Sequence, residues 1–148
     1  MLIGIDPLLG PDLLHALRAM GHGDEIVVAD ANFPAASVAA ETVVGEALRM
    51  NASTTRAVEA VLSVMPLDTF VDSPVARMEV VGNADAEPEV QAEVKALLGR
   101  IGAPGGIESV ERHAFYERAK QAFCVLQTDE RRFYGCIVLK KGVIAPDG

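Results

Sequence analysis

Short apolar runs typical of buried strands alternate along this chain with longer patterns typical of amphipathic helices. The strand-like runs occupy residues 25–30, 73–82, 107–112, 124–128 and 136–143. The helix-like patterns occupy residues 11–21, 53–66, 87–102 and 113–123. Strands separated by helices tend to pair in one sheet, with the helices packed over both of its faces. The alternation therefore predicts an α/β fold: a three-layer α/β/α domain with a central, largely parallel sheet and helices on both faces.

Local signals mark the ends of these helices. Pro11 opens the first helix and Gly21 follows its last turn. Proline suits the first turn of a helix, and glycine commonly ends one. Ser53 or Thr54 is expected to cap the second helix, and Pro88 is expected in the first turn of the third.

One stretch is expected to be a loop, and no stretch divides the chain. Residues 30–37, DANFPAAS, are predicted to form a loop because Pro34 disfavours helical geometry at Phe33. The chain contains no internal repeat, low-complexity block or linker. We therefore expect residues 1–148 to form a single domain, a common domain size.

Charge and composition disfavour several classes of protein. The formal net charge of −8 disfavours binding to nucleic acid or to an anionic membrane surface, and it is compatible with a neutral or cationic small ligand. Cys124 lies in an apolar run and is expected to be buried. The first residues include Asp6 and Asp12 and do not resemble a secretory signal, and no apolar stretch is long enough to span a membrane. We therefore expect a cytoplasmic protein.

The segment MGHGDEIVVADANFP, residues 20–34, concentrates polar residues around one predicted strand. His22 lies between Gly21 and Gly23, which permit unusual backbone angles and the close approach of another molecule. The His22 ring either complements the dipole of the preceding helix or takes part in function. Asp30 follows the strand at its carboxyl end, where open α/β sheets bind ligands, so it either caps the next turn or binds a ligand. The residues alone leave these alternatives open.

A metal site and several common catalytic motifs are disfavoured. Asp24, Glu25 and Asp30 could join His22 as ligands, but this set offers one nitrogen donor, whereas zinc usually takes more His or Cys. The chain contains no phosphate-binding P-loop, no dinucleotide-binding glycine motif and no GxSxG motif. We therefore expect neither a bound metal nor a nucleotide cofactor.

Two further clusters of polar residues lie late in the chain. Arg112, Tyr116 and Lys120 are spaced four residues apart and share one face of the predicted helix. This face is either a solvated basic stripe or part of a binding site. Tyr134 precedes Gly135 near the start of the last predicted strand, where the hydroxyl could reach a ligand while the backbone N–H and C=O stay accessible.

Several segments, taken in order, resemble one family. They are MGHGDEIVVADANFP, MPLDTFVDSP, FYERAKQAF and YGCIVLKKGV. Together they resemble the L-fucose mutarotase and D-ribose pyranase family over nearly the whole chain, and GHGDEI and FYERA are more similar to the fucose mutarotase branch. The resemblance implies a three-layer α/β domain and ring-shaped homo-oligomers, typically decamers of two pentamers, with active sites near subunit boundaries.

The same resemblance implies roles for individual residues. The family's acid catalyst matches His22 and its sugar-binding carboxylate matches Asp30, so we expect these two side chains on two sides of one sugar site. The family's sugar-binding arginine matches Arg112. Tyr116, on the same helix, is a further candidate for stacking on the sugar or bridging to it.

The family's substrate-contacting tripeptide matches Tyr134, Gly135 and Cys136. That tripeptide usually ends in asparagine, and a thiol forms weaker hydrogen bonds than an amide. A second departure is GEALRMNAS, residues 45–53, where related sequences often read RADGL. Both departures bear on which sugar is preferred more than on the chemistry.

The resemblance implies a monosaccharide mutarotase, which interconverts the α and β anomers of a reducing sugar, foremost L-fucose. Ring opening needs a base at the anomeric hydroxyl and an acid at the ring oxygen, and it needs no cofactor or metal. Histidine titrates near neutral pH and suits the acid. The alternatives are a non-catalytic monosaccharide-binding or regulatory protein, a D-ribose pyranase that interconverts pyranose and furanose rings, and a metal-dependent aldose–ketose isomerase, which the lack of a ligand set disfavours.

Overall fold

The computed structural model describes residues 1–147, and its six strands form one sheet in the order β2-β5-β1-β6-β3-β4. The strands are β1 (Glu25–Ala29), β2 (Leu48–Met50), β3 (Val75–Met78), β4 (Ile107–Val110), β5 (Cys124–Thr128) and β6 (Ile137–Lys140). The β2–β5, β5–β1 and β3–β4 pairs are parallel, whereas β6 runs antiparallel to its neighbours β1 and β3. The predicted α/β fold with a largely parallel sheet is confirmed.

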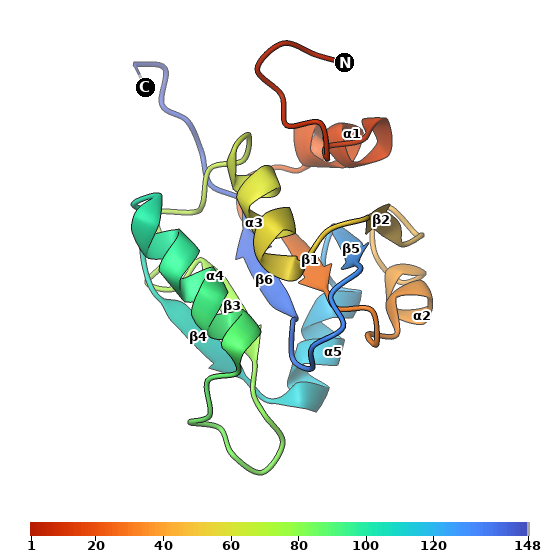
Figure 1. Ribbon diagram of the computed structural model, residues 1–148. Helices are drawn as coiled ribbons and strands as arrows, with labels where there is room; N and C mark the ends of the chain where they lie inside the picture. The colour runs from red at the N-terminus through yellow and green to blue at the C-terminus, as the bar shows by residue number, and fades with distance from the viewer. Residues whose placement is uncertain (148) are drawn as a thin grey trace.

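Helices cover both faces of the sheet (Figure 1). They are α1 (Pro11–Ala19), α2 (Ala35–Ala39), α3 (Thr54–Leu62), α4 (Glu89–Arg100) and α5 (Arg112–Lys120). Helices α1, α3 and α4 share a core with Ile26 and Val28 of β1, and α2 and α5 share a second core with Val27 and Ala29. Because alternate strand residues point to opposite faces, β1 contributes to both cores. The three-layer arrangement is confirmed.

Two of the three expected signals at the helix starts are present as predicted. Pro11 is the first residue of α1, whereas Pro88, expected in the first turn of α4, directly precedes that helix as its N-cap residue. The Ser53 hydroxyl caps α3 by accepting a hydrogen bond from the Arg56 N–H at 3.3 Å. The Ser53 contact satisfies one of the backbone N–H groups that a helix start leaves unpaired.

Two short elements were not predicted. The loop expected at residues 30–37 contains the start of α2, whose N-cap is Pro34, so that expectation is wrong from Ala35 onward. Phe33 stays outside the helix, and proline is tolerated at a helix start because the N–H that it lacks would be unpaired there. Strand β2 has three residues and pairs with β5 at the edge of the sheet. Elements this short carry no recognisable hydrophobic period.

The antiparallel β6 decides which segments meet at each end of β1. Val28, near the carboxyl end of β1, pairs with Ile137 at the start of β6. Residues 130–136, which precede β6, therefore lie beside Asp30. Lys141, which directly follows β6, bonds to the backbone of Gly23 and Asp24 and so lies beside the amino end of β1 and the His22 loop.

Two expectations from composition can be compared with the structure. Cys124 is fully buried, as expected, and burial raises the pKa of its thiol to about 12. Within residues 1–147, no helix is long and apolar enough to cross a membrane.

Candidate active site

A cavity of about 210 Å³ lies at the carboxyl end of β1, and we refer to it as the Asp30 pocket. Its polar side chains are Asp30, Asn32, Arg112, Tyr116 and Tyr134. Its other lining side chains are Phe33, Met78, Phe133 and Cys136. The pocket therefore brings together most of the residues singled out in the sequence, from the ends of β1, β3 and α5 and the segment before β6.

Asp30 is buried at the base of this pocket, and its carboxylate is largely occupied by protein donors. Oδ1 accepts from the Asn32 N–H at 2.9 Å. Oδ2 accepts from the Gly135 N–H at 3.1 Å and from the Cys136 thiol at 3.4 Å. A carboxylate offers about four acceptor positions, so about one remains for a ligand hydroxyl. Asp30 therefore both caps the next turn and can bind one ligand group.

The Tyr134–Gly135 backbone is held tightly against the protein. The Gly135 carbonyl accepts from the Thr54 hydroxyl at 2.8 Å, and its N–H is bound to Asp30. The Tyr134 carbonyl accepts from Gln91 Nε2 at 2.9 Å. The Gly135 N–H, expected to stay accessible to a ligand, is therefore already used by Asp30, and each of the two carbonyls already accepts one internal hydrogen bond. The Tyr134 side chain is the part of this segment that lines the pocket.

Cys136 occupies the position where the resembled family usually has asparagine. Its side chain is buried, and its thiol donates to Asp30. Burial, together with the Asp30 charge, raises the pKa of the Cys136 thiol well above its ordinary value. The thiol is therefore neutral at physiological pH, and its single S–H donor is hydrogen-bonded to Asp30.

Arg112 and Tyr116 interact directly on the first turns of α5. Arg112 Nε donates to the Tyr116 hydroxyl at 3.0 Å, and its guanidinium lies 5.5 Å from the centre of the Tyr116 ring. The hydrogen bond to Tyr116 raises the Arg112 pKa. Lys120 pairs instead with Glu117 at 2.7 Å and does not line the pocket. The shared helix face is thus partly lining of the Asp30 pocket and partly a solvated ion pair.

A buried acid that sequence analysis missed supports the segment before Tyr134. Glu130 accepts from both the backbone N–H and the Nε of Arg132, at 3.0 and 2.9 Å. Arg132 also makes two hydrogen bonds to Glu93 on α4, at 2.7 and 2.9 Å. The bonds from Arg132, together with the Thr54 N–H, lower the Glu130 pKa to about 2. The sequence around Glu130 suggests only a charged turn.

His22 lies at the other end of β1 and forms a pair with an acid that sequence analysis also missed. His22 Nε2 lies 3.0 Å from Oδ1 of Asp68, and the edge of the Phe70 ring packs against the imidazole at 5.2 Å between centres. The Asp68 side chain is 5% exposed, whereas that of His22 is 39% exposed. The Phe70 N–H and the His22 ring both lower the Asp68 pKa. Asp68 lies within the segment MPLDTFVDSP, but nothing local assigns it to His22.

The glycines beside His22 form a tight turn that is tied to β6. Gly23 has a φ of +85°, which favours glycine, and its N–H donates to the Lys141 carbonyl at 2.8 Å. The Asp24 carboxylate accepts from the Gly21 N–H at 2.7 Å. Lys141 Nζ donates to the Leu17 and Met20 carbonyls at the end of α1, at 2.7 and 2.6 Å. The turn that carries His22 is therefore stabilised by the Asp24 carboxylate and by the contacts of Lys141.

His22 and Asp30 do not share a site within one chain. His22 precedes β1 and Asp30 follows it, and the strand between them has five residues. At about 3.3 Å per residue this strand alone is about 16 Å long. The expectation that the two residues line one sugar site is therefore wrong for a single chain, because the strand separates them.

Residues 1–147 contain no group of three or more His, Cys, Asp and Glu side chains placed to hold a metal ion. Of the acids weighed as ligands, Glu25 instead makes two hydrogen bonds to Arg118, at 2.7 and 3.0 Å. The Arg118 pKa is raised by these bonds.

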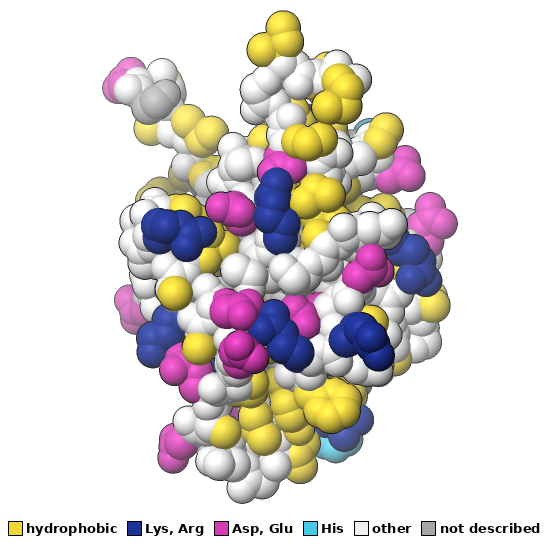
Figure 2. All heavy atoms as spheres, in the orientation of Figure 1, with side chains coloured by type: hydrophobic (Ala, Val, Ile, Leu, Met, Phe, Trp, Pro, Cys, Tyr) yellow, Lys and Arg dark blue, Asp and Glu magenta, His cyan; other side chains and the backbone are white. Residues whose placement is uncertain are grey.

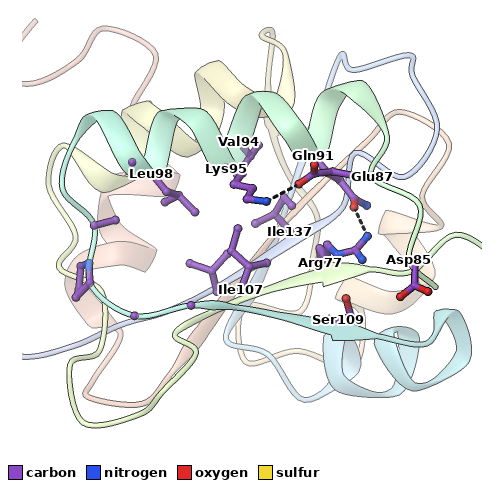
Figure 3. Close-up of a pocket in the computed structure, with 16 residues that line it drawn as sticks. Arg77, Asp85, Glu87, Gln91, Val94, Lys95, Leu98, Ile107, Ser109 and Ile137 are labelled. Carbon is purple, nitrogen blue, oxygen red and sulfur yellow. Dashed lines mark hydrogen bonds and ion pairs between the residues drawn. The ribbon is translucent and has the colours of Figure 1, made fainter.

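A larger cavity, of about 570 Å³, lies between α4 and the strands β3 and β4, and sequence analysis gave no sign of it (Figure 3). We refer to it as the α4 cavity. Val94, Leu98, Ile107 and Ile137 form its apolar part, and Arg77 and Gln91 lie at its polar end. Gln91 also bonds to the backbone of the Asp30 pocket. The two cavities are therefore linked through this side chain.

Comparison with known proteins places the whole chain in one family. Residues 3–144 match the model of the RbsD / FucU transport protein family. The fucose mutarotase of Homo sapiens is 45% identical over 146 residues, which cover 96% of this chain and 94% of the human protein. The crystal structure of the Streptococcus pneumoniae fucose mutarotase in complex with L-fucose matches with a TM-score of 0.87 and 38% identity, covering 97% of this chain and all of that chain. A crystal structure described as a putative sugar binding protein matches with a TM-score of 0.93 and 53% identity, covering 98% and 97% of the two chains. The chain therefore belongs to the RbsD / FucU family.

Proposed function

We propose that this protein is a fucose mutarotase, an isomerase that interconverts the α and β anomers of L-fucose by opening and closing the sugar ring. The observation that carries the proposal is the pair of half-sites at the two ends of β1: a hydroxyl-binding pocket around Asp30 and an acid–base pair formed by His22 and Asp68. Full-length relatives named fucose mutarotase support the same activity.

The Asp30 pocket has the chemistry of a site for a neutral monosaccharide. Asp30 retains about one acceptor position, and the Tyr134 hydroxyl, which accepts from the Val81 N–H at 3.2 Å, keeps its own proton for donation. Arg112 and Tyr116 supply further polar groups. Met78 and Phe133 supply apolar surface that suits the methyl group of a 6-deoxy sugar such as fucose.

His22 is proposed to reach the sugar from a neighbouring subunit. Since the two half-sites lie at opposite ends of β1 in one subunit, a complete site forms when the His22 end of one copy meets the Asp30 pocket of the next. Such a head-to-tail contact is heterologous, and when its rotation closes it forms a ring. This agrees with the homo-oligomer, a decamer of two pentamers, that the sequence resemblance implies.

The surface at the His22 end supports this contact. Phe70 is 73% exposed beside His22. Met1, Leu2 and Ile3 are also exposed, and Figure 2 shows hydrophobic side chains gathered around the amino terminus at the top of the view. A subunit interface would remove this apolar surface from water.

The proposed mechanism uses His22 as the acid that protonates the ring oxygen. The contact of Asp68 with His22 Nε2 orients the imidazole ring and stabilises its protonated form. Nδ1 is then left to exchange a proton with the sugar. Asp30 and Tyr134 hold sugar hydroxyls, and Gly135 and Cys136 hold Asp30 in place. A positioned acid–base group typically accelerates a reaction about 10²–10⁴-fold, which is enough for ring opening, because that reaction already proceeds unaided in water.

The test is NMR saturation transfer between the two anomers of L-fucose. His22→Ala is expected to lose most of the enzymatic exchange, while His15→Ala, which removes an exposed histidine of α1, keeps it. Wild-type exchange of L-fucose anomers that persists with a chelator supports the proposal. Binding without exchange would instead indicate a non-catalytic sugar-binding protein, and exchange of D-ribose pyranose and furanose alone would indicate a pyranase.

The two buried, unpaired cysteines, Cys124 and Cys136, agree with the cytoplasmic location that we propose for this enzyme.

A further inference from the structure

Tyr134 has a backbone conformation that other residues must hold in place. Its φ is +62°, and it is the one non-glycine residue with positive φ among residues 1–147. The left-handed region is unfavourable for a residue with a Cβ atom, and such conformations persist where surrounding contacts impose them. Other residues must therefore hold Tyr134 in this conformation, and both its carbonyl and its hydroxyl have hydrogen-bond partners.

The first contact comes from Gln91, whose buried amide is hydrogen-bonded through both its nitrogen and its oxygen. Nε2 donates to the Tyr134 carbonyl at 2.9 Å and to the Met78 carbonyl at 2.8 Å. Oε1 accepts from Arg77 at 2.8 Å. A flipped amide would place Oε1 against two carbonyl oxygens and its NH₂ group against a guanidinium. Arg77 therefore sets the orientation in which Gln91 can hold Tyr134.

The second contact comes from the segment between β3 and α4, which Arg77 also holds. Its guanidinium donates to the Ala86 and Ala84 carbonyls at 2.9 and 2.8 Å. The same segment contains Val81, whose N–H donates to the Tyr134 hydroxyl at 3.2 Å. Arg77 thus acts on both ends of Tyr134, through Gln91 at the carbonyl and through this segment at the hydroxyl.

The hydrogen-bond partners of Arg77 indicate that this side chain fixes the positions of neighbouring groups. Within residues 1–147, Arg77 forms no ion pair with a carboxylate, and its hydrogen bonds all go to neutral carbonyl oxygens. Its side chain lies at the polar end of the α4 cavity, next to Gln91 (Figure 3). A planar guanidinium can donate to several acceptors in fixed directions, which an ammonium group on a flexible stem does poorly.

We propose that Arg77 is a positioning residue for the sugar site, which fixes Gln91 and the β3–α4 segment so that Tyr134 is held toward the sugar. The proposal rests on the fucose mutarotase function proposed above. Arg77 does not touch the sugar, and its effect is exerted through Tyr134.

The first test compares Arg77→Met with Arg100→Met, a matched change at an exposed arginine of α4 that contacts Glu59 at 3.5 Å. A displacement of about 1 Å at a binding group can cost up to about 10²-fold. We expect Arg77→Met to raise the KM for L-fucose about tenfold with a smaller change in kcat, and Arg100→Met to leave both unchanged. In a Tyr134→Ala background, Arg77→Met should add almost nothing. Equal penalties with and without the Tyr134 side chain would overturn the proposal.

The α4 cavity allows a second test by chemical rescue. Arg77→Ala leaves a space of guanidinium shape next to a cavity of about 570 Å³. Added guanidinium ion, kept below denaturing concentrations, is expected to lower the raised KM of Arg77→Ala, whereas methylammonium at equal ionic strength is not. Arg77→Lys, which keeps the charge, is expected to behave like Arg77→Met. Full activity of Arg77→Lys, or of Arg77→Ala without guanidinium, would refute a positioning role that depends on the several N–H donors of the guanidinium.

A readout that does not depend on activity separates this proposal from the proposed function. The chain has two tyrosines, so a Tyr116→Phe variant assigns the ring signals of Tyr134 in an NMR spectrum. Arg77→Met should shift the Tyr134 ring signals and Arg100→Met should not. A wild-type protein without anomer exchange would refute the mutarotase function, and the ring signals would still test the link from Arg77 to Tyr134. Unshifted signals would refute that link even in an active enzyme.

Discussion

Replacing Gly135 by alanine tests how tightly the Asp30 pocket is assembled. A methyl group at Gly135 would lie 2.9 Å from Glu130 Cγ, 3.0 Å from Thr54 Oγ1 and 3.3 Å from Asp30 Cβ. Carbon atoms pack best at about 3.5–4.0 Å, so the neighbours must move by about half an ångström. Overpacking of this kind costs about 1–3 kcal/mol. Two of the displaced residues, Thr54 and Asp30, are also the partners of the Gly135 backbone.

Gly135→Ala is therefore expected to lower the melting temperature, by about 2–4 °C for each kcal/mol, and to raise the KM for L-fucose. The matched control is Gly99→Ala in α4, where a Cβ atom meets nothing within 4 Å. That change should stabilise the protein by up to about 1 kcal/mol through helix propensity. Both variants are compared at one protein concentration, because the proposed assembly would make the melting temperature depend on it. A Gly135→Ala protein with wild-type stability and KM would refute the close packing inferred here.

Three further predictions concern single groups of the two half-sites. Asp68→Asn should lower kcat by about tenfold or more with little change in KM, because an amide cannot stabilise a protonated His22 as a carboxylate does; a raised KM with unchanged kcat would contradict this role. The Glu130 pKa is lowered from 4.5 to about 2, so the ionised form stabilises the fold above about pH 4.5, and this contribution is lost as the pH falls toward about 2. Urea titrations across that range should show that the free energy of unfolding depends less on pH in Glu130→Gln than in the wild type. An unchanged pH dependence would count against the Arg132–Glu130 pair. Cys136→Asn should lower the Kd for L-fucose, measured by isothermal titration, by about fivefold if the amide gains one hydrogen bond of about 1 kcal/mol to the sugar. Weaker binding would mean that the buried site does not accommodate the amide.

Much of the fold could be predicted because its main elements carry clear local signals. The buried run in β1 and the Ser53 cap of α3 are examples. The elements missed, α2 and β2, have five and three residues and draw their stability from neighbours rather than from a pattern of their own. Tertiary contacts of this kind leave no period in the sequence.

The candidate site was predictable in its residues and less so in its arrangement. His22 and Asp30 were recognised through the segment that contains both, but the strand between them places them at opposite ends of the sheet. Asp68 lies 46 residues from His22 and is brought to it by the pairing of Leu67 with Lys141. Gln91 and Arg77 bond to backbone carbonyls. Because every residue has a backbone carbonyl, the sequence does not show which residues these side chains contact.

The central claim is that each active site combines the Asp30 pocket of one subunit with His22 of the next, and subunit complementation tests it most directly. His22→Ala and Asp30→Ala are each expected to lose anomer exchange of L-fucose as pure proteins. When the two variants are co-expressed and assemble at random in rings, about one quarter of the sites pair an intact pocket with an intact His22. Saturation-transfer NMR should then recover about one quarter of the wild-type exchange rate per subunit. Mixed oligomers that stay as inactive as the pure variants would contradict the account.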